Sequence, residues 1–402
     1  MKLVYLHQYF NTPDMPGSTR SFEMAKRIAA RGHQVHVVTS DRQESSPRGW
    51  RVEEMNGFSV HWVGVPYGNE MSYTQRIASF IKFAFLASVR CVKIRGDLIF
   101  ATSTPLTIAI PAIITKFWTR KPMVFEVRDL WPDLPIAMGA LKSPITIMLA
   151  RWLEKLAYKN ATQVVGCSAG MCEGVIRHGI PVDRVHNIPN SCDIQLFRIP
   201  ESRGERFREQ HVWLRDRPLV VYAGTFGRIN GVEYLVQVAK FALEIAPEVA
   251  FLVVGYGYDE NKIDALSKEL RVRDKNFYML PKQPKSKIPE IYSAANLVTS
   301  LFLPIEEMWA NSANKYFDGL AAGKPVAINY GGWQADLIEK KQIGVVLDSY
   351  DHETAARDIV QLVQNRHLLD QMSSNSLALA KTSFSRDKLA AQLIRVLEES
   401  IT

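Results

Sequence analysis

One short segment of this sequence combines the residue types that bind a phosphorylated ligand. Ser312 or Asn314 is expected to cap a helix that ends at Gly323, and Lys315 lies in its first turn. Oriented N–H groups at a helix start and an ammonium group both stabilise a diphosphate leaving group as negative charge builds on it. Asp318 follows Lys315 by three positions, so both side chains should point the same way. The alternative is a solvated ion pair between Lys315 and Asp318.

The loop around Gly17 is a second candidate binding element. Gly17 and Ser18 precede an expected helix, and a glycine there lets a ligand approach the backbone near the partially positive helix end. The alternative is that Gly17 is only a turn residue and that Ser18 caps the helix.

Carboxylates follow an expected strand in the first half of the chain. The segment from Glu126 to Asp133 is rich in charge and aromatic character, and Asp129 lies within it. A carboxylate here could accept a hydrogen bond from a hydroxyl of a ligand or offset a positive charge that develops on it. We expect this role for Asp129, whereas for Glu126 and Asp133 a functional and a structural interpretation both stay open.

These residues need a scaffold, and the first half of the sequence predicts a parallel sheet covered on both faces. The first unit is a strand, a helix and a strand, at residues 3 to 6, about 18 to 31, and 34 to 39. Ligands of such sheets lie at the carboxyl ends of the strands, in the loops that carry the candidate residues. Further strands are expected near residues 58 to 63, 97 to 102, 122 to 127 and 163 to 167.

The second half repeats this alternation. Residues 193 to 217 include Pro200, Gly204 and a dense set of charges and are interpreted as a linker. A last helix is expected over roughly residues 386 to 400. Between them the expected elements begin with a strand at 219 to 223, a helix at 232 to 245 and a strand at 250 to 254.

The composition of the whole chain favours two folded domains. A chain of 402 residues is too long for one ordinary core, and 47% hydrophobic and 22% charged residues are typical of a globular protein. The formal net charge of +8 favours an anionic partner. Because basic residues and stacking aromatics do not cluster together, nucleic acid is not expected, which leaves a phosphorylated ligand or a membrane surface.

The cysteines and the first residues favour a cytoplasmic protein. Cys91, Cys167, Cys172 and Cys192 lack the close pairs of metal or redox motifs and form no dense disulfide framework. The N-terminus offers no apolar stretch of signal-peptide length.

Two apolar segments bear on membrane contact. Residues 98 to 115 are uncharged, but Pro105 and Pro111 interrupt them, so we expect a strand, a turn and a helix beginning near Pro105 rather than a spanning helix. The segment from Arg76 to Arg95 is basic and rich in phenylalanine. It is either an interfacial helix that holds a peripheral protein on an anionic membrane, or a core helix with a solvated basic end.

The segment near Lys315 resembles the fourth family of glycosyltransferases, a large family of retaining enzymes with GT-B architecture. That family carries two acidic residues separated by seven, the second of which leads into a stretch like Glu-Ala-Met-Ala-x-Gly-x-Pro-Val. Asp318 opens the corresponding stretch here, so the resemblance implies that Asp318 binds the ribose. The first acid is expected at position 310, where this chain has Ala310, and Glu306 and Glu307 are near but out of register.

Weaker matches follow in the same order over about 350 residues of the chain. Gly32 opens a stretch similar to the family's Gly-His-x-Val, and Pro189 opens one similar to its Pro-Asn-Gly-x-Asp-x-x-x-Phe signature. Gly255 and Gly257 are similar to its Gly-x-Gly turn after a strand. The segment from Glu126 to Asp133 resembles a subgroup that assembles bacterial surface polysaccharides, including transferases of N-acetylated amino sugars such as fucosamine.

The loop that grips the diphosphate in that family resembles residues 222 to 231, which include Gly227 and Arg228. Many members have Arg and Lys where this chain has Thr225 and Asn230, so the positive charge must come from elsewhere. Arg228 could equally be a surface residue. The candidate cations are Arg228 and Lys315, with Lys285 and Lys287 behind them.

The resemblance as a whole implies an α/β protein of GT-B type, with two Rossmann-like domains and a cleft between them. Residues 1 to 200 would form the acceptor-binding domain, with the helix at 384 to 402 packing back on it, and residues 205 to 383 the donor-binding domain. The expected catalytic residues are Asp129, Glu126 and Lys315. The expected donor-binding residues are Gly17, Gly227, Arg228, Gly257, Asn314, Lys315 and Asp318.

The implied reaction moves a sugar from a nucleotide-sugar to an acceptor hydroxyl with retention, without a metal ion or a cofactor. We expect a UDP-linked, N-acetylated amino sugar and a lipid-linked or saccharide acceptor, in O-antigen or capsule synthesis. One alternative is a sugar-nucleotide epimerase of the same architecture. Another is a non-catalytic nucleotide-sugar-binding subunit, which Ala310 at the position of the first acid makes conceivable. The sequence leaves the base, the sugar, the acceptor and the linkage open.

Overall fold

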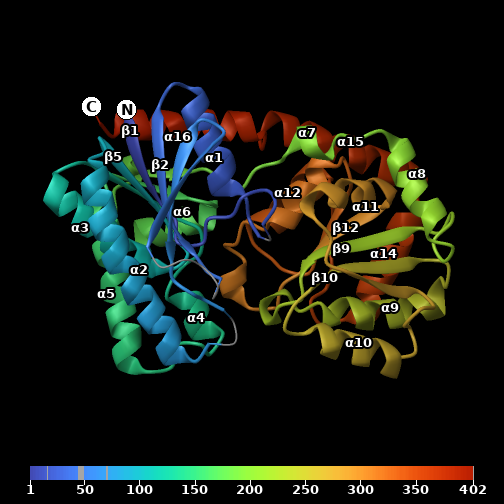
Figure 1. The fold of residues 1–402 in the computed structure, drawn as a ribbon. Helices are drawn as coiled ribbons and strands as arrows, with labels where there is room; N and C mark the ends of the chain where they lie inside the picture. The colour runs from blue at the N-terminus through green and yellow to red at the C-terminus, as the bar shows by residue number, and fades with distance from the viewer. Residues whose placement is uncertain (16, 44–48, 69–70, 402) are drawn as a thin grey trace. The chain divides into compact units, whose positions relative to one another are not determined.

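The computed structural model describes residues 1–15, 17–43, 49–68 and 71–401 and divides into two compact units (Figure 1). The first unit comprises Met1–Pro189 together with Asp387–Thr402, and the second comprises Asn190–Arg386. The chain changes units directly after Pro189, earlier than the boundary that the resemblance implies near residues 200 to 205.

The first unit is built on an eight-stranded sheet in the order β3-β4-β2-β1-β5-β6-β7-β8. All neighbouring strands are parallel except β3 and β4, which pair antiparallel. β3 was not predicted, because its four central residues are exposed and its sequence shows no alternating apolar pattern. The strands are β1 (Lys2–Leu6), β2 (Gln34–Asp41), β3 (Trp50–Met55), β4 (Phe58–Gly64), β5 (Leu98–Thr102), β6 (Met123–Val127), β7 (Gln163–Gly166) and β8 (Val185–Asn187).

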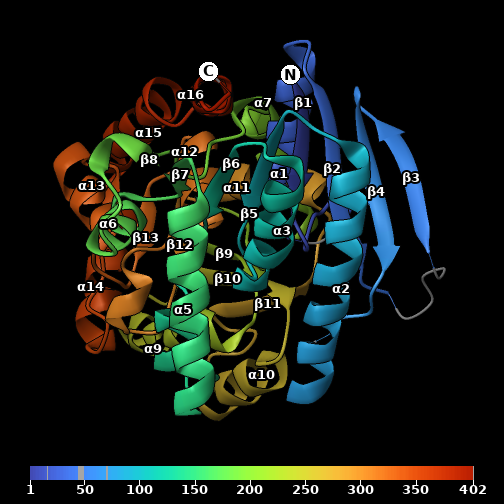
Figure 2. The ribbon, with the colours of Figure 1, turned by 90° about the vertical axis from the view of Figure 1, so that its left-hand side faces the viewer.

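Three helices of the first unit lie side by side over one face of this sheet (Figure 2): α2 (Tyr73–Ile94), α3 (Ala109–Thr119) and α5 (Pro144–Asn160). These three helices connect strands in the direction from β4 towards β7 along the sheet, whereas α1 (Arg20–Ala30) connects β1 to β2 in the opposite direction. Because such connections are right-handed, α1 lies on the other face of the sheet. Among the helices of the described residues, none is long and apolar enough to span a membrane. The remaining helices are α4 (Asp133–Ala137), α6 (Ala169–Arg177) and α16 (Arg386–Glu399).

The C-terminal helix α16 contacts α1 and the turn that follows α1 through polar side chains. Arg27 Nε donates to Asp387 Oδ1 at 2.7 Å, and His33 Nε2 lies 3.1 Å from Glu398 Oε1. The last residues of the chain therefore belong to the same unit as the first.

The second unit is built on a six-stranded parallel sheet in the order β11-β10-β9-β12-β13-β14. Buried apolar residues fill its strands, as expected for a parallel sheet with helices on both faces. The strands are β9 (Leu219–Thr225), β10 (Ala250–Tyr256), β11 (Phe277–Pro281), β12 (Leu297–Ser300), β13 (Val326–Ile328) and β14 (Gly344–Val346).

Helices surround this sheet, and two of them occupy the segment that was interpreted as a linker. That interpretation is wrong, because α7 (Ile194–Phe197) and α8 (Glu201–Gln210) form there and α8 packs on α11 (Ile288–Ala294). α8 exposes its many charges and buries Phe207 and Gly204. A Cβ at Gly204 would lie 2.7 Å from the backbone of Ser293, so only glycine allows this contact. The other helices are α9 (Glu233–Ile245), α10 (Glu260–Glu269), α12 (Asn314–Ala321), α13 (Trp333–Lys341), α14 (His352–Gln364) and α15 (Arg366–Thr382).

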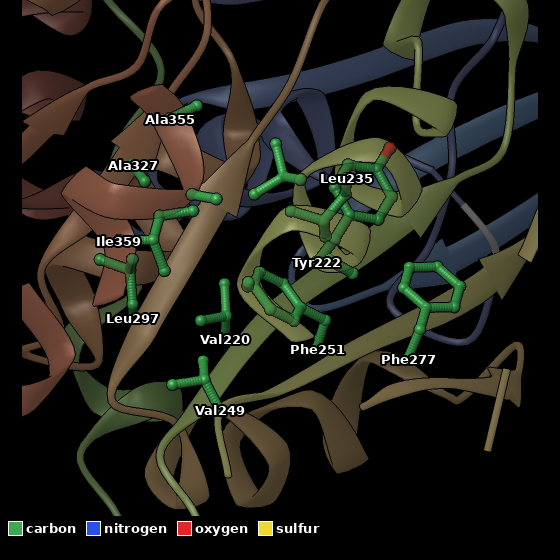
Figure 3. Close-up of a cluster of buried hydrophobic side chains, with 14 of the residues drawn as sticks. Val220, Tyr222, Leu235, Val249, Phe251, Phe277, Leu297, Ala327, Ala355 and Ile359 are labelled. Carbon is green, nitrogen blue, oxygen red and sulfur yellow. The ribbon is translucent and has the colours of Figure 1, made fainter. Parts of the chain in front are cut away.

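A core of buried apolar side chains between the sheet, α9 and α14 holds the second unit together (Figure 3). Tyr222 and Phe251 come from β9 and β10, Leu235 from α9 and Ile359 from α14, and all four are fully buried. Burial of each such side chain stabilises the fold by roughly 1.5–3 kcal/mol. The core therefore holds β9 and β10, and the loops that follow them, in fixed positions.

Each sheet has a point at which the order of the strands reverses. In the first unit this point lies between β1 and β5, and in the second between β9 and β12. The loops that leave two such neighbouring strands diverge to opposite faces of the sheet, which leaves space at their carboxyl ends for a ligand.

Candidate functional site

Lys315 reaches the carboxyl end of β9 from the first turn of α12. Its Nζ donates to Asn230 Oδ1 at 3.3 Å and lies 5.0 Å from the centre of the Tyr222 ring. A Cβ at Gly224 would lie only 2.1 Å from Lys315 Cε, so the absence of a side chain at Gly224 makes room for the lysine. Burial, with a smaller effect from the charge of Lys285, lowers the pKa of Lys315 to about 8, although Asp318 opposes this. The ammonium group is thus poorly solvated, and an anionic ligand would supply favourable contacts that water does not.

Asp318 lies one helical turn after Lys315 and is buried, whereas Lys315 is half-buried. Its Oδ2 forms a salt bridge with Lys285 Nζ, and that ammonium group lies 5.0 Å from the centre of the Phe197 ring. The ion pair of Asp318 is therefore formed with Lys285 from the segment after β11, and it is not the solvated pair with Lys315 that we considered. Two cations and one carboxylate meet around the start of α12.

The start of α12 differs from the predicted cap. Ala313 occupies the N-cap position, and no side chain caps the helix there. Ser312 instead accepts hydrogen bonds from Asn190, at Oγ from the backbone N–H (3.1 Å) and at its carbonyl from the side-chain amide (2.5 Å). Asn314 is the first helical residue and is exposed. The prediction that Ser312 or Asn314 caps the helix is thus wrong, and the positive end of α12 is left without a side-chain acceptor of its own.

The end of α12 follows the prediction. Gly323 adopts φ +64°, its N–H donates to the carbonyl of Leu320, and the N–H of Lys324 donates to that of Gly319. These two hydrogen bonds form a Schellman motif, which requires a left-handed residue at Gly323. β13 begins soon afterwards.

Glycines bring the loops after β9 and β10 close together. A Cβ at Gly255 would lie 1.9 Å from the carbonyl oxygen of Gly224, and one at Gly257 would lie 2.5 Å from that of Phe226. Gly257 also has a φ of +156°, which side chains rarely allow. The predicted site residue Gly257 therefore shapes the backbone around the loop that carries Gly227.

Arg228 points to a different group from Lys315. η3 (Arg228–Asn230) follows Gly227, and its two ends contact different partners. Arg228 is exposed, donates to the hydroxyl of Tyr258 at 2.6 Å and stacks 4.4 Å from the centre of that ring, whereas the buried Asn230 binds Lys315. Asn230 and Tyr222 were missed as contacts of the site. The sequence marked Asn230 only as a position where relatives carry a cation.

Glu126 lies at the end of β6 in the first unit, in a fully buried network. Arg20 donates from Nε and Nη2 to Glu126 Oε1 (3.0 and 2.8 Å), and Thr102 donates to Oε2 at 2.5 Å. Arg20 also donates to the carbonyls of Ile188 and Pro189. Burial alone would raise the pKa of Glu126, but the charges of Arg20 and Arg128 and these hydrogen bonds outweigh it and lower the pKa. Glu126 is thus an ionised carboxylate with both oxygens occupied.

Asp129 lies in the loop after β6 and has fewer partners. Its Oδ2 accepts a hydrogen bond from Thr104 Oγ1 at 2.6 Å. Burial raises the pKa of Asp129, and the Thr104 hydrogen bond and the charge of Arg128 only partly offset this. Asp133 begins α4 and forms an exposed ion pair with Arg151 at 3.0 Å, which favours its structural interpretation.

Gly17 is part of a polar cluster at the carboxyl end of β1. It adopts φ +117°, and a Cβ there would lie 2.8 Å from Asn11 Nδ2. The neighbouring Pro16 lies outside the described residues. Ser18 does not occupy the N-cap of α1, which is Thr19, and its Oγ accepts from Arg128 Nη2 at 3.0 Å. The interpretation of Ser18 as the helix cap is therefore wrong.

Two buried residues of this cluster, His7 and Gln8, were not predicted. Burial and the charges of Arg128 and Arg42 keep the pKa of His7 well below its usual value, and its Nε2 lies 3.4 Å from Arg128. Within the part of the chain that the structure describes, neither amide atom of Gln8 nor Nδ1 of His7 has a hydrogen-bond partner. Buried polar atoms of this kind suit contact with a ligand. The only sequence signal was their position directly after the first strand.

No metal centre is found in the described ranges, since no three His, Cys, Asp or Glu side chains there group as metal ligands would. The four cysteines are buried free thiols.

Two protein-family models match the chain. Residues 17–191 match the "Glycosyl transferase 4-like domain", and residues 204–378 match "Glycosyl transferases group 1". Together they cover most of both units. The site around Lys315 lies within the second match, and the site around Asp129 lies within the first.

Individual relatives agree with these matches. WcaI of Escherichia coli K12, a glycosyl transferase named for colanic acid biosynthesis, is 22% identical over 293 residues, which is 69% of this chain and 71% of WcaI. The fold is similar to that of sucrose-phosphate synthase from Thermosynechococcus elongatus, with a TM-score of 0.79, 17% identity and 99% of both chains covered. It is also similar to that of HepE from Anabaena, solved with UDP-glucose, with a TM-score of 0.74, 18% identity and coverage of 99% of this chain and all of HepE.

Proposed function

Because this chain belongs to the glycosyltransferases of family four, a retaining family with the GT-B fold, we propose that it transfers an N-acetylated amino sugar from a UDP-linked donor. The acceptor is a hydroxyl of a lipid-linked or saccharide molecule in the synthesis of a bacterial surface polysaccharide, and the reaction retains the anomeric configuration. The name of WcaI supports the polysaccharide role, and the UDP-glucose bound to HepE supports the donor.

The observation that carries this proposal is the half-buried ammonium group of Lys315, which lies beside Asn230 and Tyr222 at the uncapped start of α12. We assign the diphosphate of the donor to this position, where the ammonium group and the helix start offset the charge of the leaving UDP. Asp318 and Lys285 then bind the ribose hydroxyls, as acceptor and donor of hydrogen bonds. Gly227 and Gly257 have no side chains, so the surrounding loops leave room for the donor. Arg228 and Asn314 line the exposed side of the site.

On the acceptor side we assign the binding of the reacting hydroxyl to Asp129. Among the described residues only Thr104 donates to its carboxyl group, at Oδ2, so Oδ1 is left to contact a hydroxyl of the acceptor. Glu126 is assigned a positioning role, because Arg20 and Thr102 already occupy both of its oxygens. Gly17, His7 and Gln8 complete the polar edge at β1.

The donor half is tested by a thermal-shift screen of nucleotides and UDP-sugars against the parent protein, Lys315→Ala and Asp318→Ala. A ligand at 100 times its dissociation constant should stabilise the parent protein by about 2.7 kcal/mol. The two variants should respond much less, whereas Lys341→Ala, an exposed lysine of α13, should respond like the parent. Equal responses in all four proteins would refute the assignment.

The reaction itself is tested by UDP release in the presence and absence of saccharide and lipid-linked acceptors. We expect release that requires an acceptor and a product whose glycosidic bond keeps the donor's configuration. Conversion of the donor without an acceptor would instead indicate an epimerase. Donor binding without transfer to any acceptor would indicate a non-catalytic subunit.

A further inference from the structure

The exposed apolar side chains of this protein are concentrated on three helices of the first unit. Of the twenty large apolar side chains that are exposed in the described residues, eleven lie on α2, α3 and α5. These helices lie side by side on one face of the sheet (Figure 2). The most exposed members, which we call the apolar face, are Ile81, Phe85, Phe117, Trp118, Ile145, Met148 and Trp152, each 61–78% exposed.

The arrangement within each helix shows that these residues point away from the core. On α2, Phe83 and Ala87 are buried against the sheet, whereas Ile81 and Phe85 are exposed and continue a stripe with a spacing of four residues. Single exposed apolar residues are normal, but a group on neighbouring helices marks an interaction surface.

The charges around the apolar face are almost all positive. Residues 73–95, 109–121 and 142–160 contain five, three and four Lys and Arg, twelve in all, and a single acid, Glu154. Glu154 is buried and accepts a hydrogen bond from Tyr158. These three segments carry a net charge of +11, so the rest of the chain, which has +8 in total, carries −3. The net positive charge of the protein is therefore concentrated in these three segments, although Arg151 is paired with Asp133 and Arg90 donates to His61.

We propose that α2, α3 and α5 dock on an anionic lipid bilayer, with the apolar face inserted at the headgroup boundary and the basic side chains on lipid phosphates. Aromatic and aliphatic side chains flanked by Lys and Arg are the pattern of helices that lie in a membrane interface. A second copy of this chain is a poorer occupant, because a symmetric contact would press two positively charged surfaces together. If the function proposed above is also correct, docking delivers the enzyme to a lipid-linked acceptor.

Vesicle flotation tests this surface with the full chain. The parent should bind vesicles of phosphatidylcholine containing phosphatidylglycerol, should bind pure phosphatidylcholine vesicles much more weakly, and should be released by salt. Phe85→Gln and Trp152→Gln should each weaken binding about tenfold or more, because each side chain loses its apolar burial. Lys82→Glu with Lys93→Glu should weaken it by about fivefold for each charge removed.

Matched controls separate this surface from general stickiness. Val212→Gln removes an apolar residue that is 72% exposed on the second unit, and Lys340→Glu with Lys341→Glu changes the same charges on α13. Both should bind vesicles like the parent. Equal binding by the face variants and the controls, or equal binding to neutral and anionic vesicles, would overturn the proposal.

Two further measurements keep the outcomes distinct. In sedimentation experiments without lipid, the parent and Phe85→Gln should have the same oligomeric state. If the parent self-associates and Phe85→Gln does not, the apolar face is a contact between copies of the chain, and the proposal is wrong. The face variants should keep the thermal response of the parent to UDP, since they lie outside the donor site. If the parent itself shows no thermal response to UDP, the donor assignment is refuted, and the result of the vesicle experiment still stands.

Discussion

At the scale of single residues, Lys315 is the side chain on which the donor site depends. It is a lysine held beside an amide and an aromatic ring, while the neighbouring Asp318 is paired with Lys285. An ammonium group in this position is poorly solvated in the free protein and gains most when an anion binds. Two predictions follow from its environment, and a third follows from the glycine that makes room for it.

Lys315→Met should weaken UDP binding by roughly ten- to a hundredfold, since a hydrogen bond to a charged group contributes about 1.5–3 kcal/mol. Titration calorimetry measures the dissociation constants. Lys341→Met on α13 is the matched control and should bind like the parent. An unchanged dissociation constant for Lys315→Met would place the diphosphate elsewhere.

The pH dependence of UDP binding should report the lowered pKa of Lys315. Only the protonated lysine attracts the diphosphate, so affinity should fall as the pH rises through about 8. Lys315→Met should lack this step. Because the pKa is lower in the folded than in the unfolded chain, the free parent protein should also become more stable relative to Lys315→Met above pH 8. A flat affinity profile in the parent from below to above pH 8 would contradict the assignment.

Gly224→Ala should weaken UDP binding without a change at Lys315 itself. The new methyl group would overlap Lys315 Cε and force the lysine out of its place. Gly68→Ala is the matched control, because it adds a methyl group into open space, unlike a substitution at Gly179, where a positive φ would strain any side chain. Calorimetry should show full UDP affinity in Gly68→Ala and reduced affinity in Gly224→Ala.

At the scale of secondary-structure elements, the buried ion pair of Arg20 and Glu126 joins four parts of the first unit. Arg20 comes from α1, Glu126 ends β6, Thr102 ends β5, and the carbonyls of Ile188 and Pro189 follow β8. The network fixes the carboxyl ends of β5 and β6, and Asp129 lies in the loop that follows β6. The network holds these elements in place, but it need not make the fold more stable than apolar residues of the same size would.

Glu126→Ala should therefore destabilise the protein by about 3–5 kcal/mol, since it leaves the guanidinium of Arg20 buried without a counter-charge. Chemical denaturation measures the loss. Glu353→Ala is the matched control, because it removes the carboxylate of an exposed ion pair with Arg357 and should cost at most about 1 kcal/mol. Similar losses in the two variants would show that the buried network has no special role.

At the scale of the whole molecule, each unit has its own sheet and its own core, and the donor contacts that we assign lie in the second unit. The charge of the chain is divided as well, with a net +11 on residues 73–95, 109–121 and 142–160 of the first unit and −3 on the rest. Binding of a nucleotide and binding of a membrane should therefore be separable properties of one chain.

Hydrogen exchange can show this separation directly. UDP should protect the backbone amides of the loops after β9, β10 and β12 and of the first turn of α12, and it should leave α2, α3 and α5 unchanged. Anionic vesicles should do the reverse. Protection of α2 by UDP alone would show that the two properties are coupled.

The sequence by itself determined much of this protein. Runs of apolar residues at β1, β5, β6 and β9 and the glycine at the end of α12 predict local structure, because a strand pattern and a left-handed C-terminal residue can be recognised from neighbouring residues. The family motif around Asp318 likewise identified the helix that carries the candidate site. β3 and α8 escaped prediction because their sequences are polar and their positions depend on distant partners.

Only the tertiary structure decided which side chains meet. The sequence places Lys315 and Asp318 together, but it cannot show that Asp318 pairs with Lys285, that Lys315 crosses Gly224 to reach Asn230, or that Glu126 is saturated by Arg20. These contacts join residues 33 to 106 positions apart in the chain. Their geometry depends on how the strands are ordered in the sheet, and local sequence does not encode that order.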